Sequence, residues 1–486
     1  MKLSIELTRS AAHQPLPAGI RRSLFNAAKH SRLIEWAFNF CRINQSLKSD
    51  FLKLTENCRN FAINNEIVTG FLEHFKRNVI GANGFTLQSK TAPETARKIE
   101  RLWNEYQSRS GGYVTLDERM SGRDFDLMIL RNLIIDGEVF IRRVYDPASK
   151  FGWRYELIDA FDIDPYYNDE FTDGSRIVMG IEFDPRGRER AFHLRRNRNS
   201  DMYFGGERIR IPAEHMIHIF RKFIPDQSRG YSMLAPVAVA LGHMDAYKEA
   251  EIVRARIMAA TLLVWEKTGA DNNMLDEADK NGDIFTKTEM GSAQFAPDGY
   301  TAKFFQNTSP NSNFGAFWVG LLRSMSNAIG LSYNKANGDY TSINYSSARE
   351  ATLEDRAFFE EFQNFIIENW KELQFREFLK VAALNGLVQV DDSAFQHRFF
   401  GRRFQWVDPA KEIAALEKEL SLKLTDPITE LEKRGFDPDE VLDRWAIWEQ
   451  KCKERGIVPP QPQNYNLIDA VPPDENEKEK TDESES

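Results

Sequence analysis

A long helix is predicted for residues 235–264, within the stretch RGYSMLAPVAVALGHMDAYKEAEIVRARIMAATLLV that spans residues 229–264. Pro236 lies in its first turn, where proline is tolerated because the missing N–H has no helical partner. The residues of one face recur at spacings of three and four, as expected for an amphipathic helix. Because half of that face is alanine, neighbouring helices can approach it closely. The face consists of Ala246, Ala250, Val253, Ile257, Ala260 and Val264.

Working outward from this stretch, helical periodicity returns on both sides and a β region lies before it. Residues 346–384 contain no proline and would make one helix about 58 Å long. The other predicted helices cover residues 64–79, 91–106, 121–135, 312–329 and 408–455. The predicted strands cover residues 138–145, 154–158, 176–183, 191–194 and 215–220, with short ones at 261–266 and 301–306. The fold class is therefore α+β and predominantly helical.

The charge of the chain is acidic overall but unevenly distributed. The 486 residues, enough for about two to four domains, carry 64 Lys+Arg and 73 Asp+Glu, a net charge of −9. That balance argues against a protein that grips duplex DNA. Residues 1–110 carry +8, residues 186–222 carry +6, residues 471–486 carry −5 and the remainder carries −18. This segregation indicates surfaces of differing sign or, equally, solvated helix faces.

Cysteine usage and hydropathy indicate where the protein folds. Three cysteines at wide spacing, Cys41, Cys58 and Cys452, do not make a disulfide framework and fit a reducing compartment. The amino-terminal residues lack the apolar region of a signal peptide. The longest nearly apolar run, residues 258–265, is far too short to span a membrane. We expect a protein made and folded in the cytoplasm, without membrane contact.

The strongest candidate for chemistry is a carboxylate cluster of Asp159, Asp162 and Asp164. Paired carboxylates can hold Mg²⁺ for nuclease work. However, Asp164-Pro165 and the residues that follow are typical of turns, where aspartate is common. Neither a phosphate-binding loop nor a zinc spacing occurs in the sequence. We therefore expect neither a cofactor nor a metal, and keep the carboxylate site as the alternative.

Several short motifs, taken in order, resemble the lambda-type portal proteins of tailed phages. The resemblance extends over about residues 60–455, and the stretch NYSSAR at residues 344–349 precedes a long helix in that family, as it does here. The other matching segments are RGYSMLAP at 229–236, DAY at 245–247, AEIVRAR at 250–256, GDYTSI at 338–343, NL at 132–133, DGEVF at 136–140 and LID at 157–159.

The resemblance implies a portal-type subunit with a wing, a stem, a clip and a crown. It divides the chain into an N-terminal arm (1–60), a wing (61–234, with its β region at 137–222), a stem helix (235–262), a clip (263–311), a second stem helix (312–330), a tunnel loop (331–345), a long wing helix and return (346–407), a helical crown (408–456) and a disordered acidic tail (457–486).

The function that the resemblance implies is a head–tail connector rather than an enzyme. Its subunits, usually twelve, would form a ring at one capsid vertex, through which double-stranded DNA is packaged and ejected. The implied partners are the terminase large subunit, a head–tail adaptor, and the major capsid and scaffold proteins. The protein would reside in the virion after assembly in the host cytoplasm.

Two sets of residues are candidates for that role. In the tunnel loop, Asn334, Lys335, Asn337 and Asp339 would lie toward the DNA, with Lys335 making weak, transient phosphate contacts. The equal alternative for Lys335 is a solvated loop lysine. In the stem, Ala246, Ala250, Val253, Ile257 and Ala260 would pack between subunits.

Two further function classes stay open at this point. One is a metal-dependent nuclease or maturation hydrolase of a phage assembly, using Asp159, Asp162 and Asp164. The other is a tail or baseplate interaction protein. The mass of the native particle distinguishes the ring from an enzyme, because a ring of about twelve chains is far heavier than an ordinary enzyme dimer.

Overall fold

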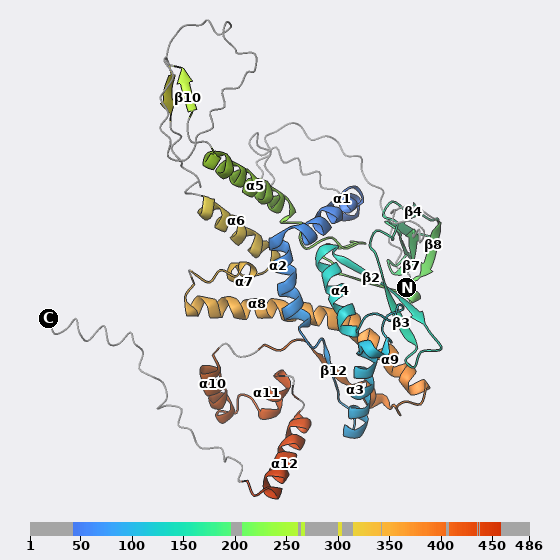
Figure 1. The fold of residues 1–486 in the computed structure, drawn as a ribbon. Helices are drawn as coiled ribbons and strands as arrows, with labels where there is room; N and C mark the ends of the chain where they lie inside the picture. Colours follow the sequence, from blue (N-terminus) through green and yellow to red (C-terminus); the bar gives the residue numbers. More distant parts are fainter. Residues whose placement is uncertain are drawn as a thin grey trace, which may run out of the picture.

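The computed structural model describes residues 42–195, 207–260, 264–267, 300–303, 314–341, 343–404, 408–434, 436 and 438–457. Figure 1 shows an elongated subunit with a central helical body and sheets on one side. Helices α5 (Ala238–Ala260) and α6 (Phe314–Ile329) lead to one end, where β10 (Val264–Lys267) pairs with β11 (Tyr300–Lys303). The opposite end consists of α10 (Pro409–Ser421), α11 (Pro427–Lys433) and α12 (Pro438–Glu454).

One long helical rod forms the centre of the body and confirms the helix predicted for residues 346–384. It runs from α8 (Tyr345–Ile366) through a π-helical turn, η5 (Ile367–Lys371), into α9 (Glu372–Leu384). A π-helical turn shifts the helical register, and Trp370 and Lys371, neighbours in this turn, are both buried. The Trp370 indole donates a hydrogen bond to Asp126 at 2.9 Å, and the Lys371 ammonium lies 2.8 Å from the same carboxylate.

The remaining helices pack their apolar faces around this rod. Phe75, for example, meets the rings of Phe358, Phe359 and Phe362 at centroid distances of 5.7, 5.4 and 5.2 Å. Edge-to-face contacts of this kind stabilise aromatic cores. These helices are α2 (Glu66–Phe75), the π-helical turn η2 (Lys76–Ile80), α3 (Pro93–Gln107) and α4 (Gly122–Ile135), while α1 (Ile43–Asn64) packs on α2 and α4, and the 3₁₀ turn η3 (Arg109–Gly111) has no buried residue.

The β region contains two antiparallel sheets that lie beside the helical body. The first has the order β3-β2-β9, with β2 (Glu138–Tyr145), β3 (Trp153–Ile158) and β9 (Met216–Phe220). The second has the order β4-β5-β6-β7-β8, with β4 (Asp169–Glu170), β5 (Arg176–Val178), β6 (Ile181–Phe183), β7 (Glu189–Arg195) and β8 (Arg208–Pro212). A separate pair joins β1 (Thr86–Ser89) to β12 (His397–Phe400); short 3₁₀ turns are η4 (Ala213–His215) and η6 (Asp392–Phe395).

Three sequence predictions differ from the structure. The single strand predicted for residues 176–183 is wrong, because Met179 and Gly180 adopt positive φ angles of 49° and 83° and split it into the hairpin of β5 and β6. Strand β8 was not predicted. The boundary placed at residue 60 falls inside α1, whose polar residues hid its periodicity. By contrast, the predicted turn at residues 184–187 joins β6 to β7, with the Gly187 N–H donating to the Asp184 carbonyl.

Residues 229–236 connect the β region to α5, and two glycines make that connection possible. Gly137, which follows α4, and Gly230 lie with their backbones in contact. A Cβ on Gly137 would lie 2.0 Å from the Tyr231 carbonyl oxygen, and one on Gly230 would lie 2.2 Å from the Gly137 oxygen. Only glycine permits such an approach. The Met233 N–H then donates to the Ile134 carbonyl at 3.0 Å, so the start of α5 is tied to the end of α4.

The side chain of Arg229 is fully buried where both sheets meet the helical body. Its Nε donates to Glu138 Oε1 on β2 at 2.7 Å, and both side chains have 0% exposure. Its two Nη atoms donate to the carbonyls of Ala160 and Met179, each at 2.9 Å. The guanidinium also lies 4.6 Å from the ring centroid of Phe51 on α1. One side chain therefore joins α1, β2, the segment after β3 and the turn between β5 and β6.

His218 on β9 completes this buried charge cluster. Its Nε2 lies 3.2 Å from Glu138 Oε2 and its Nδ1 lies 2.8 Å from Glu189 Oε1 on β7. Burial by itself would lower the pKa of His218, but the carboxylates of Glu189 and Glu138 outweigh burial and raise the pKa above its ordinary value of 6.5. The cluster of Arg229, His218, Glu138 and Glu189 is then electrically balanced when the imidazole is protonated.

Replacing Arg229 is expected to destabilise the fold strongly. Arg229→Met leaves Glu138 buried without its main counter-ion, which costs about 3–5 kcal/mol. The control is Arg188→Met, whose partner Asp184 lies in an exposed turn, so that this change costs about 0–1 kcal/mol. Calorimetry of both variants measures the difference. Equal losses would contradict the role assigned to Arg229.

The same cluster predicts a pH dependence of stability. Because the pKa of His218 is raised in the folded state, its contribution is fully present below about pH 6.5 and is lost as pH rises through the folded pKa. His218→Gln should therefore flatten the fall in thermal midpoint between about pH 6 and pH 9. His215→Gln, a change at an exposed histidine, is the control and should keep the wild-type slope. An unchanged slope in His218→Gln would refute the assignment.

Candidate functional site

The predicted tunnel segment, residues 331–345, joins the end of α6 to the start of α8 (Figure 1). The prediction of a loop throughout is wrong, because residues Tyr333–Asn337 form a short helix, α7, capped by Ser332. The Ser332 N–H and hydroxyl both donate to the Asp355 carboxylate of α8, at 2.8 and 2.6 Å. The segment is therefore held against the rod at its beginning. A helix of five residues carries too little periodicity for α7 to be read from the sequence.

Two of the four candidate DNA-facing residues hold this segment together. The Asn337 side chain donates to the Ser326 hydroxyl of α6 at 3.2 Å. The Tyr333 hydroxyl donates to Asp339 at 2.8 Å. Burial and that hydrogen bond raise the pKa of Tyr333. Hydrogen bonds from the Thr341 hydroxyl and, second, from the Thr341 N–H lower the pKa of Asp339. Asn337 thus ties the segment to α6, and Asp339 has its partner within the segment.

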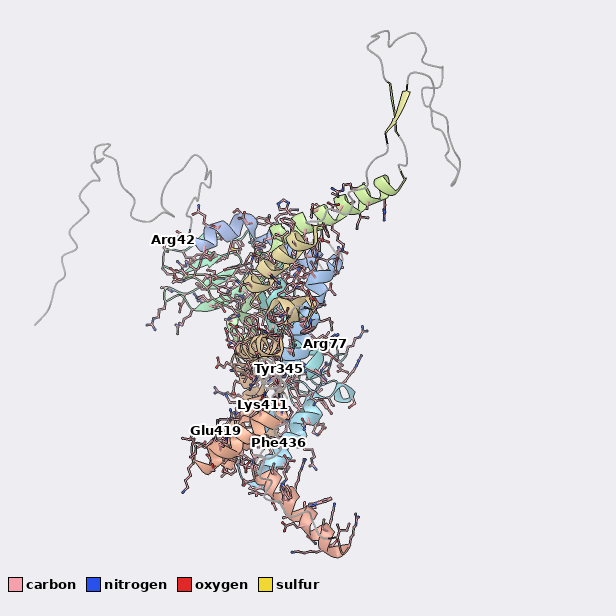
Figure 2. The ribbon with its side chains drawn as sticks, turned by 90° about the vertical axis from the view of Figure 1, so that its left-hand side faces the viewer. Arg42, Arg77, Tyr345, Lys411, Glu419 and Phe436 are labelled. Atoms are coloured by element: carbon pink, nitrogen blue, oxygen red, sulfur yellow. The ribbon has the colours of Figure 1, made fainter. Side chains whose placement is uncertain are left out.

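The other two candidates are free to contact something else. The side chains of Asn334 and Lys335 are partly exposed and form no hydrogen bond or ion pair within the part of the chain that the structure describes. Figure 2 looks at the edge of the subunit on which α8 begins, with Tyr345 at its centre and Lys411 of α10 below it. The Tyr345 hydroxyl donates to Asp408 at 3.2 Å, which joins the start of α8 to the start of α10.

Lys335 lines a basic hollow that the sequence analysis did not find. The hollow has a volume of about 460 Å³ and brings Lys335 of α7 together with Arg356 of α8 and with Arg402 and Arg403, which follow β12. Its base contains Asn78, whose side-chain oxygen accepts from Arg402 at 3.1 Å. These residues come from four separate segments of the chain, so no local pattern could have revealed them.

The predicted stem face lies on the part of α5 that extends beyond the body. Leu241 and Met244 are buried against the body, whereas Ala246, Ala250 and Val253 are exposed, the last at 43%. Tyr247 stacks on Phe314 of α6 at a centroid distance of 5.4 Å, which holds the two helices side by side. Ile257 and Ala260 lie on α5 beyond the side chains that the structure describes.

The helices at the other end, α10 to α12, also leave large apolar side chains uncovered. Trp445 and Trp448 of α12 are 60% and 53% exposed, and Leu442 is 65% exposed. Such surfaces are typical of contacts with another protein rather than with water. Others on these helices and their connections are Ile413, Leu422, Leu424, Ile428, Phe436 and Ile447.

The carboxylates of the alternative reading do not form a site. Asp159 accepts hydrogen bonds from Arg59 at 2.7 and 3.1 Å. Asp164 is buried, and Arg208 donates to it at 2.9 Å. Among the described residues, no group of histidine, cysteine, aspartate and glutamate side chains is arranged to hold a metal ion. None of the described helices is long and apolar enough to cross a membrane.

Comparisons with known proteins point to one family. The sequence profile described as phage portal protein, lambda family, matches residues 31–363. A probable portal protein of Halomonas phage phiHAP-1 is 28% identical over 448 residues, covering 88% of this chain and 86% of that protein. Portal protein B of Escherichia phage lambda is 20% identical over 414 residues, covering 75% of each chain.

Solved structures with a similar chain come from the necks of gene transfer agent particles. A neck computed with C6 symmetry has a TM-score of 0.45 at 12% identity, covering 80% of this chain and 94% of that chain. The neck of the native particle, computed with C12 symmetry, has a TM-score of 0.44 at 14% identity, with the same coverage. Since the family profile matches more than half of the sequence, this chain belongs to the lambda family of phage portal proteins.

Proposed function

We propose that copies of this portal protein, twelve in number as the resemblance implies, close into a ring at one vertex of the capsid. Beyond family membership, the observation that carries this proposal is the apolar surface that a single chain leaves uncovered on α5 and on α10 to α12. Large apolar patches on a folded protein are usually covered by a partner. A ring covers them repeatedly, because each subunit presents the same surfaces to the next.

The regions of the proposed subunit follow the long axis of Figure 1. The stem is formed by α5 and α6, the clip by residues 263–311, of which the structure describes only β10 and β11, the wing by residues 61–234 and 346–407, and the crown by residues 408–456. We infer that the clip meets the terminase large subunit during packaging and a head–tail adaptor afterwards. Major capsid and scaffold proteins contact the outside of the ring during assembly in the host cytoplasm, and the ring remains in the virion.

Double-stranded DNA passes through the centre of the proposed ring, and the action on it is mechanical rather than catalytic. The edge seen in Figure 2, with residues 331–345 and the start of α8, faces the channel. Dense lysine and arginine contacts would hold phosphates by counterion release and stop the DNA from sliding. The net charge of −9 suits a conduit in which contacts are few and weak. The free side chains of Asn334 and Lys335 supply such contacts.

A substitution on the exposed face of α5 tests the stem contact. Ala250→Glu places a charge where the next subunit packs and should convert rings to single chains without unfolding them. Ala255→Glu, the same change about 140° around the helix, is the control and should still form rings. Sedimentation velocity measures both. Rings in both variants would remove this face from the interface.

The role of Lys335 is tested by the amount of DNA held per head. Lys335→Ala rings should have normal mass, because alanine removes a charge without introducing a repulsive one. Particles assembled with this variant should package or retain less DNA, since the weak phosphate contact is lost. Quantitative measurement of DNA in purified heads gives the result. Unchanged packaging and retention would leave Lys335 as a solvated lysine only.

A further inference from the structure

Helix α8 lies between two hollows of nearly equal size, which meet at Asp355, a residue that lines both. The basic hollow, about 460 Å³, includes Arg356, and a second hollow, about 470 Å³, includes Glu354. At 100° per residue, the side chains of Glu354 and Arg356 point in directions about 160° apart around the helix axis. Figure 2 looks along α8 from its start at Tyr345. Arg77, whose carbonyl accepts from Arg402 of the basic hollow, projects on one side of it.

The second hollow is acidic, and one of its carboxylates has no counter-ion. Glu361 forms an ion pair with Arg221, and Asp355 accepts two hydrogen bonds from Ser332. Glu354 is exposed and forms no ion pair or hydrogen bond among the described residues. Small residues surround it: Gly330, Ala351 and Ala357 also line this hollow. Space and an unpaired negative charge therefore occur together on this flank.

The basic hollow has the opposite imbalance. Within the described ranges, Lys335, Arg402 and Arg403 form no ion pair with any carboxylate. Burial lowers the pKa of Arg356. The carboxylates of Glu412 and Glu360 raise this pKa, and the like charge of Arg402 lowers it further. Positive charges held this close repel one another, so an added negative charge stabilises the arrangement.

We propose that the acidic flank of one subunit docks against the basic flank of the next, so that Glu354 faces Arg403 of the neighbouring copy. The inference rests on the proposed ring. In a ring the contacts are heterologous, which means that one flank of each subunit meets the opposite flank of its neighbour. The two flanks carry opposite charge and lie at the same height along α8, so they are complementary when neighbouring subunits meet. The basic hollow is then completed by a carboxylate from a second copy of the chain.

Charge reversal on each flank, and on both, tests this contact. The variants of the full chain are Glu354→Arg, Arg403→Glu, and both changes together. Neither Glu354 nor Arg403 makes an ion pair or hydrogen bond within the described chain, but Arg403→Glu removes the cation–π contacts of Arg403 with Phe400 and Phe436. Glu368→Arg, a reversal on the exposed side of η5, is the matched control. Sedimentation velocity across a concentration series at about 0.1 M salt gives the assembly midpoint, and circular dichroism confirms folding.

Each single-flank reversal should raise the concentration needed for assembly by about tenfold or more, because like charges then meet across the contact. The two changes together should restore assembly to within about threefold of wild type, and Glu368→Arg should not differ from wild type. Assembly of both single-flank variants at the wild-type midpoint would overturn the inference while leaving the ring intact. Failure of the combined variant to recover would also overturn it, because the two flanks then do not meet.

A second readout separates a subunit contact from a phosphate site. Inorganic phosphate and a short DNA duplex are titrated onto wild type and onto the Arg403→Glu variant. If that variant assembles normally but loses binding of either probe, the basic hollow is an anion site and the inference is wrong. If wild type remains a single chain at every concentration, the proposed ring itself fails, which is a different outcome from failure of the α8 contact.

Discussion

The buried ion pair between Arg229 and Glu138 is the interaction on which the rest of the subunit depends. It lies where α1, both sheets and the start of α5 converge, and its guanidinium satisfies backbone carbonyls of two further segments. A buried pair of this kind is costly to break, because each partner would remain charged in an apolar environment. The adjoining contact of Gly137 with Gly230 leaves no room for any side chain. Together they set the direction in which α5 leaves the body.

That direction determines which surfaces remain uncovered. The lower part of α5 is buried by the body, while the part beyond it exposes Ala246, Ala250 and Val253. At the opposite end, Trp445 and Trp448 are not covered by any of the residues that the structure describes. A rigid centre with uncovered apolar ends is suited to a subunit that is completed by identical neighbours. The same rigidity suits a conduit, since the wall must not collapse onto the DNA that moves through it.

The helices were predictable from sequence because they carry long amphipathic patterns, as in residues 121–135 and 346–384. The π-helical turn at residues 367–371 was not predictable, because it depends on the pairing of Lys371 with Asp126 across the core. The hairpin at Met179 and Gly180 looked like one continuous strand, since its apolar residues continue through the turn. Lys335 could be named as a candidate, but the arginines around it arrive from distant segments through packing alone. Likewise, nothing local showed that Asp159 and Asp164 are already occupied by Arg59 and Arg208.

The central claim is that this chain assembles into a ring with an open centre. Electron microscopy of the purified full chain, combined with native mass measurement, tests it most directly. The account predicts round particles with a central hole and a mass of about 670 kDa, twelve times that of the 56.1-kDa chain. Solid particles without a hole, or a single species with the mass of one or two chains at every concentration, would contradict it.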